Sequence, residues 1–289
     1  MKIVNIVGGL GNQMFQYAFA CYLKYLFPDE DVLLDTHHFA HYNLHNGYEL
    51  NRVFLNLTIP IASKEQVKKL ARYIPHYKLS RLARKLLPVL KTEYIGRINM
   101  LFDECVGKVE GDCYYDGYWQ AIDYSLPIRA KLQKEFEFPS PNTYNTELKR
   151  EINNCNSVGI HVRRGDYLKE KDFRGICDID YYKTAISFLF KENPTRRFYI
   201  FSNDMEWCQE NIEPMLQGAE VCYVTGNMRQ DSCWDIFLMN QCKSLIVANS
   251  SFSWWGAFLN KNNPLVIAPK QWKNGQDTHG MYAADWILL

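Results

Sequence analysis

Short apolar segments separated by segments of helical periodicity constrain the fold of this 289-residue chain more than any other feature of its sequence. Residues 2–7 are largely apolar and are followed by a glycine-rich turn, after which apolar residues recur at helical spacing from Phe15 to Leu26. A second apolar segment occupies residues 31–35. A strand, a helix and a strand in this order form a βαβ unit, in which the two strands lie parallel and the helix covers them. The sequence therefore predicts an α/β fold with parallel sheets.

The second half of the chain shows the same alternation. We expect strands at residues 157–162, 197–201, 220–224, 244–248 and 265–268, and helices at 180–192, 205–215, 231–242 and 252–260. Residues 139–146 (PSPNTYNT) are rich in turn formers and are the predicted linker between the two halves. We therefore expect two domains, 1–145 and 146–289, with the last helix of the second packing back on the first. The usual place for a ligand in such a protein is between the two halves.

The charge balance and the cysteines exclude several classes of protein. Lys and Arg number 33 against 32 Asp and Glu, so the formal net charge is +1 and no global field attracts nucleic acid. No apolar run approaches the ~20 residues that span a bilayer. Nine cysteines without a CxxC pair indicate neither a disulfide framework nor a zinc site. We expect reduced thiols and a cytoplasmic location.

Residues 64–97 are strongly basic, with ten Lys and Arg against two acidic residues. Helices are expected at 64–74 and 77–87. In the second, one apolar stripe consists of Leu79, Leu82, Ala83, Leu86 and Leu90. Two interpretations stay open, a solvated face on helices that pack over a domain and attachment to an anionic membrane surface.

An arginine pair follows the apolar segment 157–162, in the sequence HVRRGDY at residues 161–167. Ligands of open α/β sheets bind beyond the carboxyl ends of the strands. Arg163 and Arg164 offer forked donors suited to a phosphate or diphosphate at that place. The alternative is a salt bridge between an arginine and Asp166 within a loop, but the position at a strand end favours anion binding.

A glycine-rich turn, GGLGNQ at residues 8–13, lies between the first strand and the first helix. Glycines let a ligand approach the backbone, and the N-terminus of the next helix presents free N–H groups to an anion. Asp35 resembles the ribose-binding acid of nicotinamide-binding proteins, but Met14 stands where their third glycine belongs. A plain tight turn is the alternative.

Two further polar groups follow apolar segments of the second half. Residues 249–256 (NSSFSWWG) combine hydroxyl groups with the start of a helix, where phosphate oxygens can bind. The alternative, which the motif by itself favours, is serine capping of that helix with two tryptophans in the core. Asn203 and Asp204 end the 197–201 segment and either contact a base edge or cap the next helix. Because all these groups lie at strand ends of one sheet, we expect them to converge on one site.

Two patterns imitate metal sites. Asp178 and Asp180 form a DxD sequence, but Asp180 immediately precedes a helix, where an N-cap is expected. Four histidines between residues 37 and 45 include an i, i+4, i+8 series, but neither a cysteine nor an HExxH pattern accompanies them. The histidines are His37, His38, His41 and His45. We interpret the first pattern as capping and the second as an aromatic-rich acceptor loop.

The sequence resembles the bacterial α-1,2-fucosyltransferases. The resemblance is carried by GGLGNQMFQYAFA, HVRRGDY, YIFSND and NSSFSWWGAF, which follow one another in this order between residues 3 and 260. DGYW at residues 116–119 is also similar. HxRRGD is shared with other fucosyltransferases, whereas GGLGNQMFQYA together with SSFSWW is more specific.

The resemblance implies a GT-B-like architecture of two facing Rossmann-type domains, the first on the acceptor side. It also implies transfer of L-fucose from GDP-β-L-fucose to the 2-hydroxyl of a galactoside, with inversion and with neither a metal nor a cofactor. The acceptor would be a galactose-containing oligosaccharide or a lipid-linked glycan, at the inner face of the cytoplasmic membrane. A weak peripheral contact with that membrane is then expected.

The family pattern also implies roles for single residues. Arg163 would bind the β-phosphate, with Arg164 and His161 beside it, and Asn203 or Asp204 would lie near the guanine. The phosphates would be lined by Ser250, Ser251, Phe252 and Ser253. The first domain would contribute Gly11, Asn12 and Gln13. Asp166 is our candidate general base, or it orients Arg163.

Two other hypotheses are a nicotinamide-dependent oxidoreductase and a non-catalytic protein that binds a sugar nucleotide. The missing third glycine argues against the first. Binding of the sugar nucleotide without turnover would indicate the second.

Overall fold

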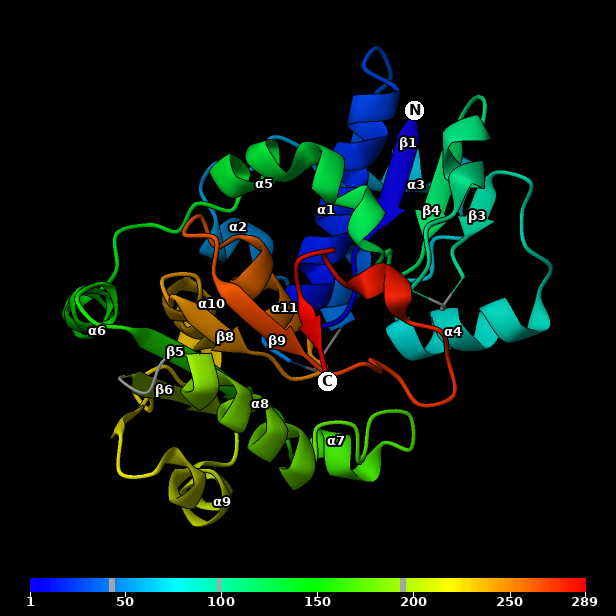
Figure 1. Cartoon of the computed structure of the whole chain (residues 1–289). Coiled ribbons are helices and arrows are strands. Elements are labelled where there is room, and N and C mark those ends of the chain that lie inside the picture. The colour runs from blue at the N-terminus through cyan, green and yellow to red at the C-terminus, as the bar shows by residue number, and fades with distance from the viewer. Residues whose placement is uncertain (42–44, 98–99, 193–195) are drawn as a thin grey trace. The chain divides into compact units, whose positions relative to one another are not determined.

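A computed structural model describes residues 1–41, 45–97, 100–192 and 196–289. The chain divides into two compact units, Met1–Pro139 and Ser140–Leu289, each built around its own parallel sheet (Figure 1). The division falls at Pro139, before the expected boundary at 145. The short 3₁₀ helices of the chain are His37–His41, Glu104–Lys108, Ile122–Tyr124, Leu126–Ile128, Glu213–Leu216, Arg229–Ser232 and His279–Met281.

The first unit contains a four-stranded sheet in the order β2-β1-β4-β3, and its strand pairs are parallel. The strands are β1 Lys2–Asn5, β2 Val32–Asp35, β3 Glu93–Ile95 and β4 Cys113–Asp116. The helices are α1 Leu10–Leu26, α2 Leu50–Val53, α3 Lys64–Leu70, α4 Tyr77–Leu86 and α5 Arg129–Glu135. The predicted βαβ unit is confirmed as β1-α1-β2. The sequence did not indicate β3 and β4, because their residues, EYI and CYYD, form no apolar run.

Helix α1 is buried along almost its whole length rather than along one stripe. Phe19 stacks on Trp119 with ring centroids 3.9 Å apart, and Tyr115 and Tyr124 meet Phe19 edge-on. Such pairs contribute roughly 0.5–1.5 kcal/mol each beyond their buried area. The aromatic residues of this unit therefore fill its core.

The second unit contains a six-stranded parallel sheet in the order β10-β9-β8-β5-β6-β7. The strands are β5 Ser157–Val162, β6 Arg197–Ser202, β7 Glu220–Tyr223, β8 Ser244–Ile246, β9 Leu265–Ala268 and β10 Ile287–Leu288. Counted within this unit from β5, the order is 3-2-1-4-5-6, the arrangement of dinucleotide-binding folds. The strand order reverses between β5 and β8, so the switch point at which such folds bind ligands lies at the ends of these two strands.

Helices cover both faces of this sheet (Figure 1). The helices are α6 Thr143–Asn153, α7 Asp166–Lys169, α8 Ile179–Glu192, α9 Met205–Asn211, α10 Cys233–Met239 and α11 Ser251–Phe258. On one face, α8 and α9 bury residues such as Tyr182, Leu189 and Cys208 against Val158 and Ile160 of β5. The five predicted strands and four predicted helices of this half are confirmed, with ends that differ by a few residues.

One expectation about the second half is wrong. The predicted linker 139–146 already contains the start of α6, because Asn142 caps that helix by accepting a hydrogen bond from the Asn145 N–H at 2.9 Å. The last element of the chain is β10, which pairs parallel with β9, and packing of the last helix on the first unit stays a prediction. The C-terminal residues therefore complete the sheet of their own unit.

The basic segment forms the two expected helices, α3 and α4, but the apolar stripe of α4 does not pack inward. Val67 and Leu70 of α3 are buried against the sheet. In α4 only Ser80 is buried, and Leu79, Leu82 and Leu86 are exposed, whereas Leu90, beyond the end of the helix, is half-buried. Over the described parts of the chain, no helix combines the length and the apolar character needed to cross a membrane.

Candidate active site

Three polar motifs of the second unit lie at the carboxyl edge of three neighbouring strands. HVRRGDY begins in the last two residues of β5 and continues past its end, Asn203 and Asp204 follow β6, and residues 249–253 follow β8. In the sheet β5 lies between β8 and β6 and pairs in parallel with both, so all three strands end at the same edge. The predicted convergence is confirmed for the motifs of this unit.

Arg163 lies on the accessible side of this edge. Its Nη2 atom is 2.9 Å from the carboxylate of Asp166, the first residue of α7. Its guanidinium also lies 5.3 Å from the centre of the Tyr167 ring. Both side chains of the ion pair are partly exposed, 33% for Arg163 and 53% for Asp166. The guanidinium is therefore oriented by its neighbours yet retains donors for an anionic ligand.

Arg164 is held more firmly than Arg163. Its backbone N–H donates to Asn203 Oδ1 at 2.9 Å, and its Nε donates to Asp204 Oδ2 at 3.0 Å. The guanidinium carbon lies 4.1 Å from the centre of the Trp207 ring, within cation–π distance. The other oxygen of Asp204 accepts from the Trp207 N–H at 3.2 Å and caps α9. Asn203 and Asp204 thus have structural partners in Arg164 and α9.

The turn between Arg164 and Asp166 requires glycine. Gly165 has φ +61° and ψ −103°, a conformation that other residues rarely adopt. A Cβ atom at this position would stand 2.8 Å from Asn203 Nδ2. Both requirements keep the arginine pair close to the end of β6.

His161 is a buried, neutral residue under the site. Burial, with a smaller contribution from Arg163, lowers the pKa of His161 to about 3. Its ring centroid lies 5.9 Å from that of Phe252, and its Nδ1 atom has no hydrogen-bond partner among the described residues. A neutral imidazole here leaves the positive charge of the site to the arginines.

Residues 250–253 form the start of α11. The Ser250 hydroxyl accepts from the Phe252 N–H at 3.4 Å and caps the helix. Ser251 and Phe252 are partly exposed. Ser253 is fully buried, and its hydroxyl donates to the carbonyls of Ala248 and Ser250. The expectation that Ser253 presents its hydroxyl to a phosphate is therefore not supported by its position, whereas Ser250 and Ser251 lie at the edge of the site.

The glycine-rich turn of the first unit supplies fewer exposed groups than expected. Gln13 is fully buried, and its amide donates to the carbonyls of Gly8 and Gly47 at 2.8 Å and accepts from the Glu49 N–H at 2.9 Å. Gly11 is also buried, within the first turn of α1. Asn12 is partly exposed, and its Oδ1 accepts from Gln120 Nε2 at 2.9 Å. Gln13 therefore holds the loop around residue 47, and Asn12 alone of the three presents side-chain atoms at the surface.

The patterns that imitate cofactor and metal sites have structural roles. Asp35 accepts hydrogen bonds from the Tyr114 hydroxyl at 2.7 Å and from the N–H and ring of His37, so it is not available to a ribose. Asp178, not Asp180, caps α8, because the Tyr181 N–H donates to Asp178 Oδ1 at 3.0 Å. Burial lowers the pKa of His38 to about 4. Within the described ranges, no group of three His, Cys, Asp or Glu side chains is placed to hold a metal ion.

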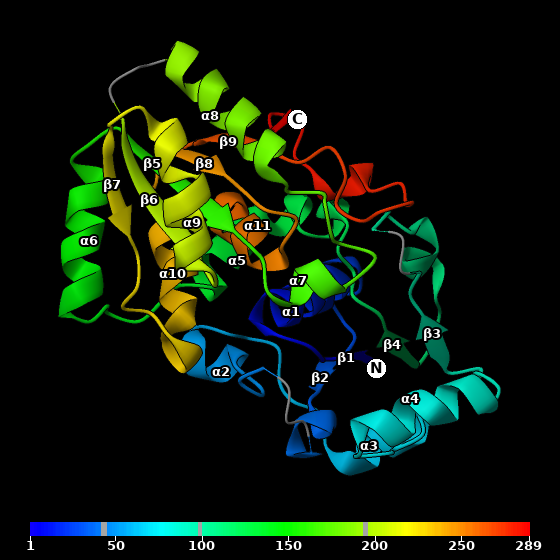
Figure 2. The ribbon, with the colours of Figure 1, turned by 90° about the horizontal axis from the view of Figure 1, so that it is seen from below.

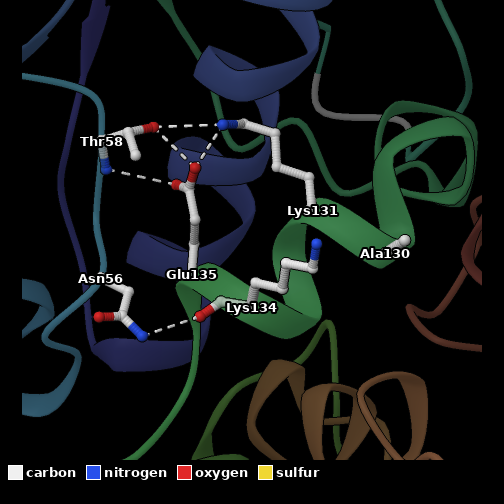
Figure 3. Close-up of a pocket in the computed structure, with 6 residues that line it drawn as sticks. All are labelled: Asn56, Thr58, Ala130, Lys131, Lys134 and Glu135. Atoms are coloured by element: carbon white, nitrogen blue, oxygen red, sulfur yellow. Dashed lines mark hydrogen bonds and ion pairs between the residues drawn. The ribbon is translucent and has the colours of Figure 1, made fainter.

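An open pocket of about 470 Å³ in the first unit was not indicated by the sequence (Figure 3). Its floor is Glu135, whose carboxylate accepts hydrogen bonds from Thr58, Lys131 and Tyr17. Although burial opposes it, these hydrogen bonds hold the pKa of Glu135 below its ordinary value. Since the chain itself satisfies the carboxylate, we interpret this pocket as a structural junction of α1, α5 and the Asn56–Thr58 segment.

Two aromatic residues of the candidate site, Tyr167 and Trp207, were not predicted from the sequence. Trp207 stacks on Arg164, and Tyr167 lies beside Arg163. The only sequence signal for Trp207 is that it stands three residues after Asp204. If Asp204 caps a helix, its carboxylate is expected to accept a hydrogen bond from the backbone N–H at that position. Its contact with the arginine depends on the tertiary structure.

Three comparisons with known proteins bear on these observations. The alpha-1,2-colitosyltransferase of Escherichia coli is 32% identical over 93% of this chain and 91% of that protein. The human galactoside alpha-(1,2)-fucosyltransferase 1 is 34% identical over a shorter region, 38% of this chain and 31% of that protein. Among solved structures, a mutant of Arabidopsis thaliana FUT1 in complex with GDP has a TM-score of 0.51 and 13% identity, and covers 92% of this chain and 69% of that one.

The structural similarity confirms the predicted GT-B-like α/β fold with parallel sheets. The family model described as glycosyl transferase family 11 matches residues 1–289, the whole chain. A match of this extent, together with the bacterial relative, defines the class of enzyme. The chain belongs to glycosyl transferase family 11.

Proposed function

We propose that this enzyme transfers L-fucose from GDP-β-L-fucose to the 2-hydroxyl of a galactoside, with inversion at the anomeric carbon and without a metal ion. The observation that carries the proposal is the position of Arg163 and Arg164 at the switch point of the second sheet, beside the N-terminus of α11. The names of the relatives support the sugar, the linkage and the galactoside. Membership of a glycosyltransferase family leaves the oxidoreductase hypothesis and the non-catalytic hypothesis without support.

The donor diphosphate would bind between the arginines and the start of α11. Arg163 would take the β-phosphate, because its guanidinium is partly exposed and oriented by Asp166. Arg164 would contribute charge from a fixed position. Ser250, Ser251 and the N–H groups of the first turn of α11 would face the remaining phosphate oxygens.

The rest of the donor would be held by groups around this diphosphate site. Asn203 and Asp204 lie at the end of β6, where the guanine is expected, and His161 and Phe252 would form the neutral floor. Asn12 is our remaining candidate for a contact from the first unit.

These groups match the charge that develops in the reaction. Fucosyl transfer passes through an oxocarbenium-like state while negative charge grows on the departing GDP, and preorganised donors stabilise that charge. Inversion requires the acceptor hydroxyl to lose its proton, and Asp166 is our candidate for the base. Its contact with Arg163 makes orientation of that arginine the other role of the same carboxylate.

Asp166→Asn distinguishes the two roles of this residue. If Asp166 is the base, kcat falls and its pH profile no longer shows the ionisation of an acidic group, while KM for the donor changes little. If it only orients Arg163, the pH profile is kept and KM for the donor rises, since asparagine holds the guanidinium less firmly.

Colitose is a second candidate for the transferred sugar. The relative that matches nearly the whole chain is named a colitosyltransferase, whereas the fucosyltransferase match covers little more than a third of the chain. Colitose is L-fucose without its 3-hydroxyl, so the diphosphate site described here would serve both donors. The discrimination would depend on whether a polar group of the enzyme pairs with that hydroxyl.

The acceptor would be a galactose-containing oligosaccharide or a lipid-linked glycan in the cytoplasm. For a lipid-linked acceptor the enzyme would work at the inner face of the cytoplasmic membrane, and the basic segment 64–97 would provide a weak peripheral contact.

The decisive experiment measures GDP release from GDP-fucose and from GDP-colitose with a panel of galactosides, followed by linkage analysis of the product. We expect release only with a galactoside present, and an α-1,2 linkage in the product. A faster reaction with GDP-colitose would assign the second donor. GDP release that no galactoside stimulates, or a linkage to another hydroxyl, would contradict the proposal.

A further inference from the structure

Helix α4 presents an apolar stripe to solvent. Leu79, Leu82 and Leu86 follow one another at i, i+3 and i+7, so their side chains lie on one face. They are 56%, 52% and 73% exposed. Leu87 and Val89 continue the apolar surface beyond the end of the helix. Five large apolar side chains within eleven residues make this the densest exposed apolar surface among the residues that the structure describes.

A basic stripe runs beside the leucines on the same helix. Lys78, Arg81 and Lys85 have the same i, i+3, i+7 spacing, one position before each leucine, and are exposed. Since each basic residue directly precedes a leucine, the basic stripe lies about 100° around the helix from the leucine stripe. The two stripes therefore form one continuous surface that is apolar along one side and positively charged along the other.

The third side of α4 attaches the helix to the first unit and fixes which stripes face outward. Ser80 is buried, and Arg84 forms an ion pair with Asp116 at the end of β4. Beyond the helix, Arg72 Nη1 donates to the carbonyl of Pro88 at 2.7 Å. Because these contacts hold the middle and the C-terminal end of the segment, the leucines cannot turn inward without breaking an ion pair. The helix lies at the margin of its unit (Figures 1 and 2).

We infer that α4 is an interfacial helix that lies on an anionic lipid surface, with the leucine stripe in the boundary between headgroups and acyl chains and the basic stripe among the headgroups. A helix with leucines on one face and Lys and Arg on the next is the form that binds in this way. Near an anionic leaflet each of the three basic side chains raises the affinity by about fivefold at low salt.

The charges favour a lipid surface over a second copy of the chain. A symmetric contact through the leucines of two α4 helices would bring the two basic stripes close to each other, and like charges at such an interface oppose association. An anionic lipid surface satisfies both stripes at once. This inference rests on the peripheral membrane contact proposed above. It adds that the leucine stripe inserts into the lipid surface, which charge attraction alone does not provide.

Vesicle flotation of the whole protein tests the inference without donor or acceptor, so its outcome is independent of the proposed reaction. We expect binding to vesicles of phosphatidylglycerol and phosphatidylcholine, and much weaker binding to phosphatidylcholine alone. In the triple variant L79S/L82S/L86S, binding should fall by at least about tenfold, because the transfer of leucine side chains out of water is lost. The matched control L55S/L126S/L168S changes three equally exposed leucines of other segments and should bind as the wild type does.

A second pair of variants tests the charge. K78Q/R81Q/K85Q should bind anionic vesicles at least about tenfold more weakly at low salt, whereas K108Q/K183Q/K261Q, with the same net charge, should not. Activity on a soluble galactoside should be unchanged in all four variants. Binding that the leucine changes leave unaltered, or binding that is equal on neutral vesicles, would overturn the inference. A wild-type dimer that L79S/L82S/L86S converts to a monomer, without vesicle binding, would assign the face to a second copy instead.

Discussion

At the scale of single residues, the two neighbouring arginines of the candidate site differ in how they are held. Arg164 is fixed by Asp204, Asn203 and Trp207, whereas Arg163 has a single ion-pair partner and is one-third exposed. Arg163 is therefore the guanidinium that has donors to spare for a ligand, and Arg164 shapes the strand end.

We expect Arg163→Lys to lower kcat by about 10²–10³ while the protein stays folded, because lysine offers one point charge where a diphosphate requires a planar fork. The measurement is steady-state GDP release, with circular dichroism to verify folding. Arg174→Lys, a change at an exposed arginine downstream in the same unit, is the control and should keep full activity. A variant that retains more than about a third of the wild-type kcat would show that the role assigned to Arg163 is wrong.

The turn at Gly165 allows backbone strain to be separated from crowding. Gly165→Ala should lower the free energy of unfolding by about 2–3 kcal/mol, since it combines an unfavourable φ with a Cβ that meets Asn203. Gly175→Ala has a similar φ of +76° but open space around the new Cβ, so it should cost only about 1 kcal/mol. Urea unfolding measures both. Equal losses in the two variants would mean that the contact with Asn203 carries no weight.

At the scale of the elements, helix ends explain why some sequence motifs are not ligand sites. Asp178 bonds the N–H of Tyr181 at the start of α8, whereas Asp180 lies in the exposed first turn. We expect Asp178→Ala to lower the free energy of unfolding by about 1 kcal/mol and Asp180→Ala by less than about 0.5 kcal/mol. A larger loss for Asp180→Ala in urea unfolding would reverse the assignment of the cap.

The junction of α6 and α10 predicts a dependence of stability on pH. Asn145 and Asn227 exchange hydrogen bonds at 2.9 Å, and Asn227 donates to Asp235 at the same distance. Burial raises the pKa of Asp235 from 3.8 to about 7. Between about pH 4 and pH 7 the unfolded chain has released this proton while the folded chain still holds it, so stability falls as pH rises through this window and is constant above it.

Asp235→Asn removes this titration and keeps an oxygen that can accept from Asn227. The difference in unfolding free energy, wild type minus variant, should fall by roughly 2 kcal/mol between pH 4 and pH 7. A raised pKa contributes about 1.4 kcal/mol for each pH unit between its unfolded and folded values, and partial exposure of the carboxyl to water reduces the total. Urea unfolding at a series of pH values gives this difference. A difference that is constant with pH would contradict the shifted titration of Asp235.

At the scale of the whole molecule, the arginines and helix N-termini of the second unit supply the positive charge that the proposed reaction needs. We therefore expect the same transfer rate in excess EDTA as with added Mg²⁺ or Mn²⁺. GDP release with a fixed galactoside measures this, and Asp178→Ala should behave as the wild type does. A loss of activity on chelation that a metal ion restores would contradict the metal-independent mechanism.

Much of the fold could be predicted from the sequence because the inner strands of the second sheet are short and mostly buried. The segment 157–162 is largely apolar and 265–268 is apolar throughout, and polar or turn residues mark where they end. The strands β3 and β4 carried no such signal, since their residues, EYI and CYYD, include charged side chains and tyrosines and form no apolar run. The environment of the leucines of α4 could not be predicted, because an apolar stripe shows which residues share a helix face but not whether that face packs on the core or faces solvent.

The sequence by itself determined the family, the parallel α/β units and the motifs at the ends of β5, β6 and β8, because these depend on local periodicity and on residue types that stand next to one another. Only the tertiary structure decided how the polar groups are used. In the structure Gln13 and Ser253 are buried, and Arg164 contacts both Asp204 and Trp207. The leucines of α4 are exposed to solvent. The physical reason is that a hydrogen bond or a buried contact depends on the distance between atoms from separate segments, which residue order does not specify.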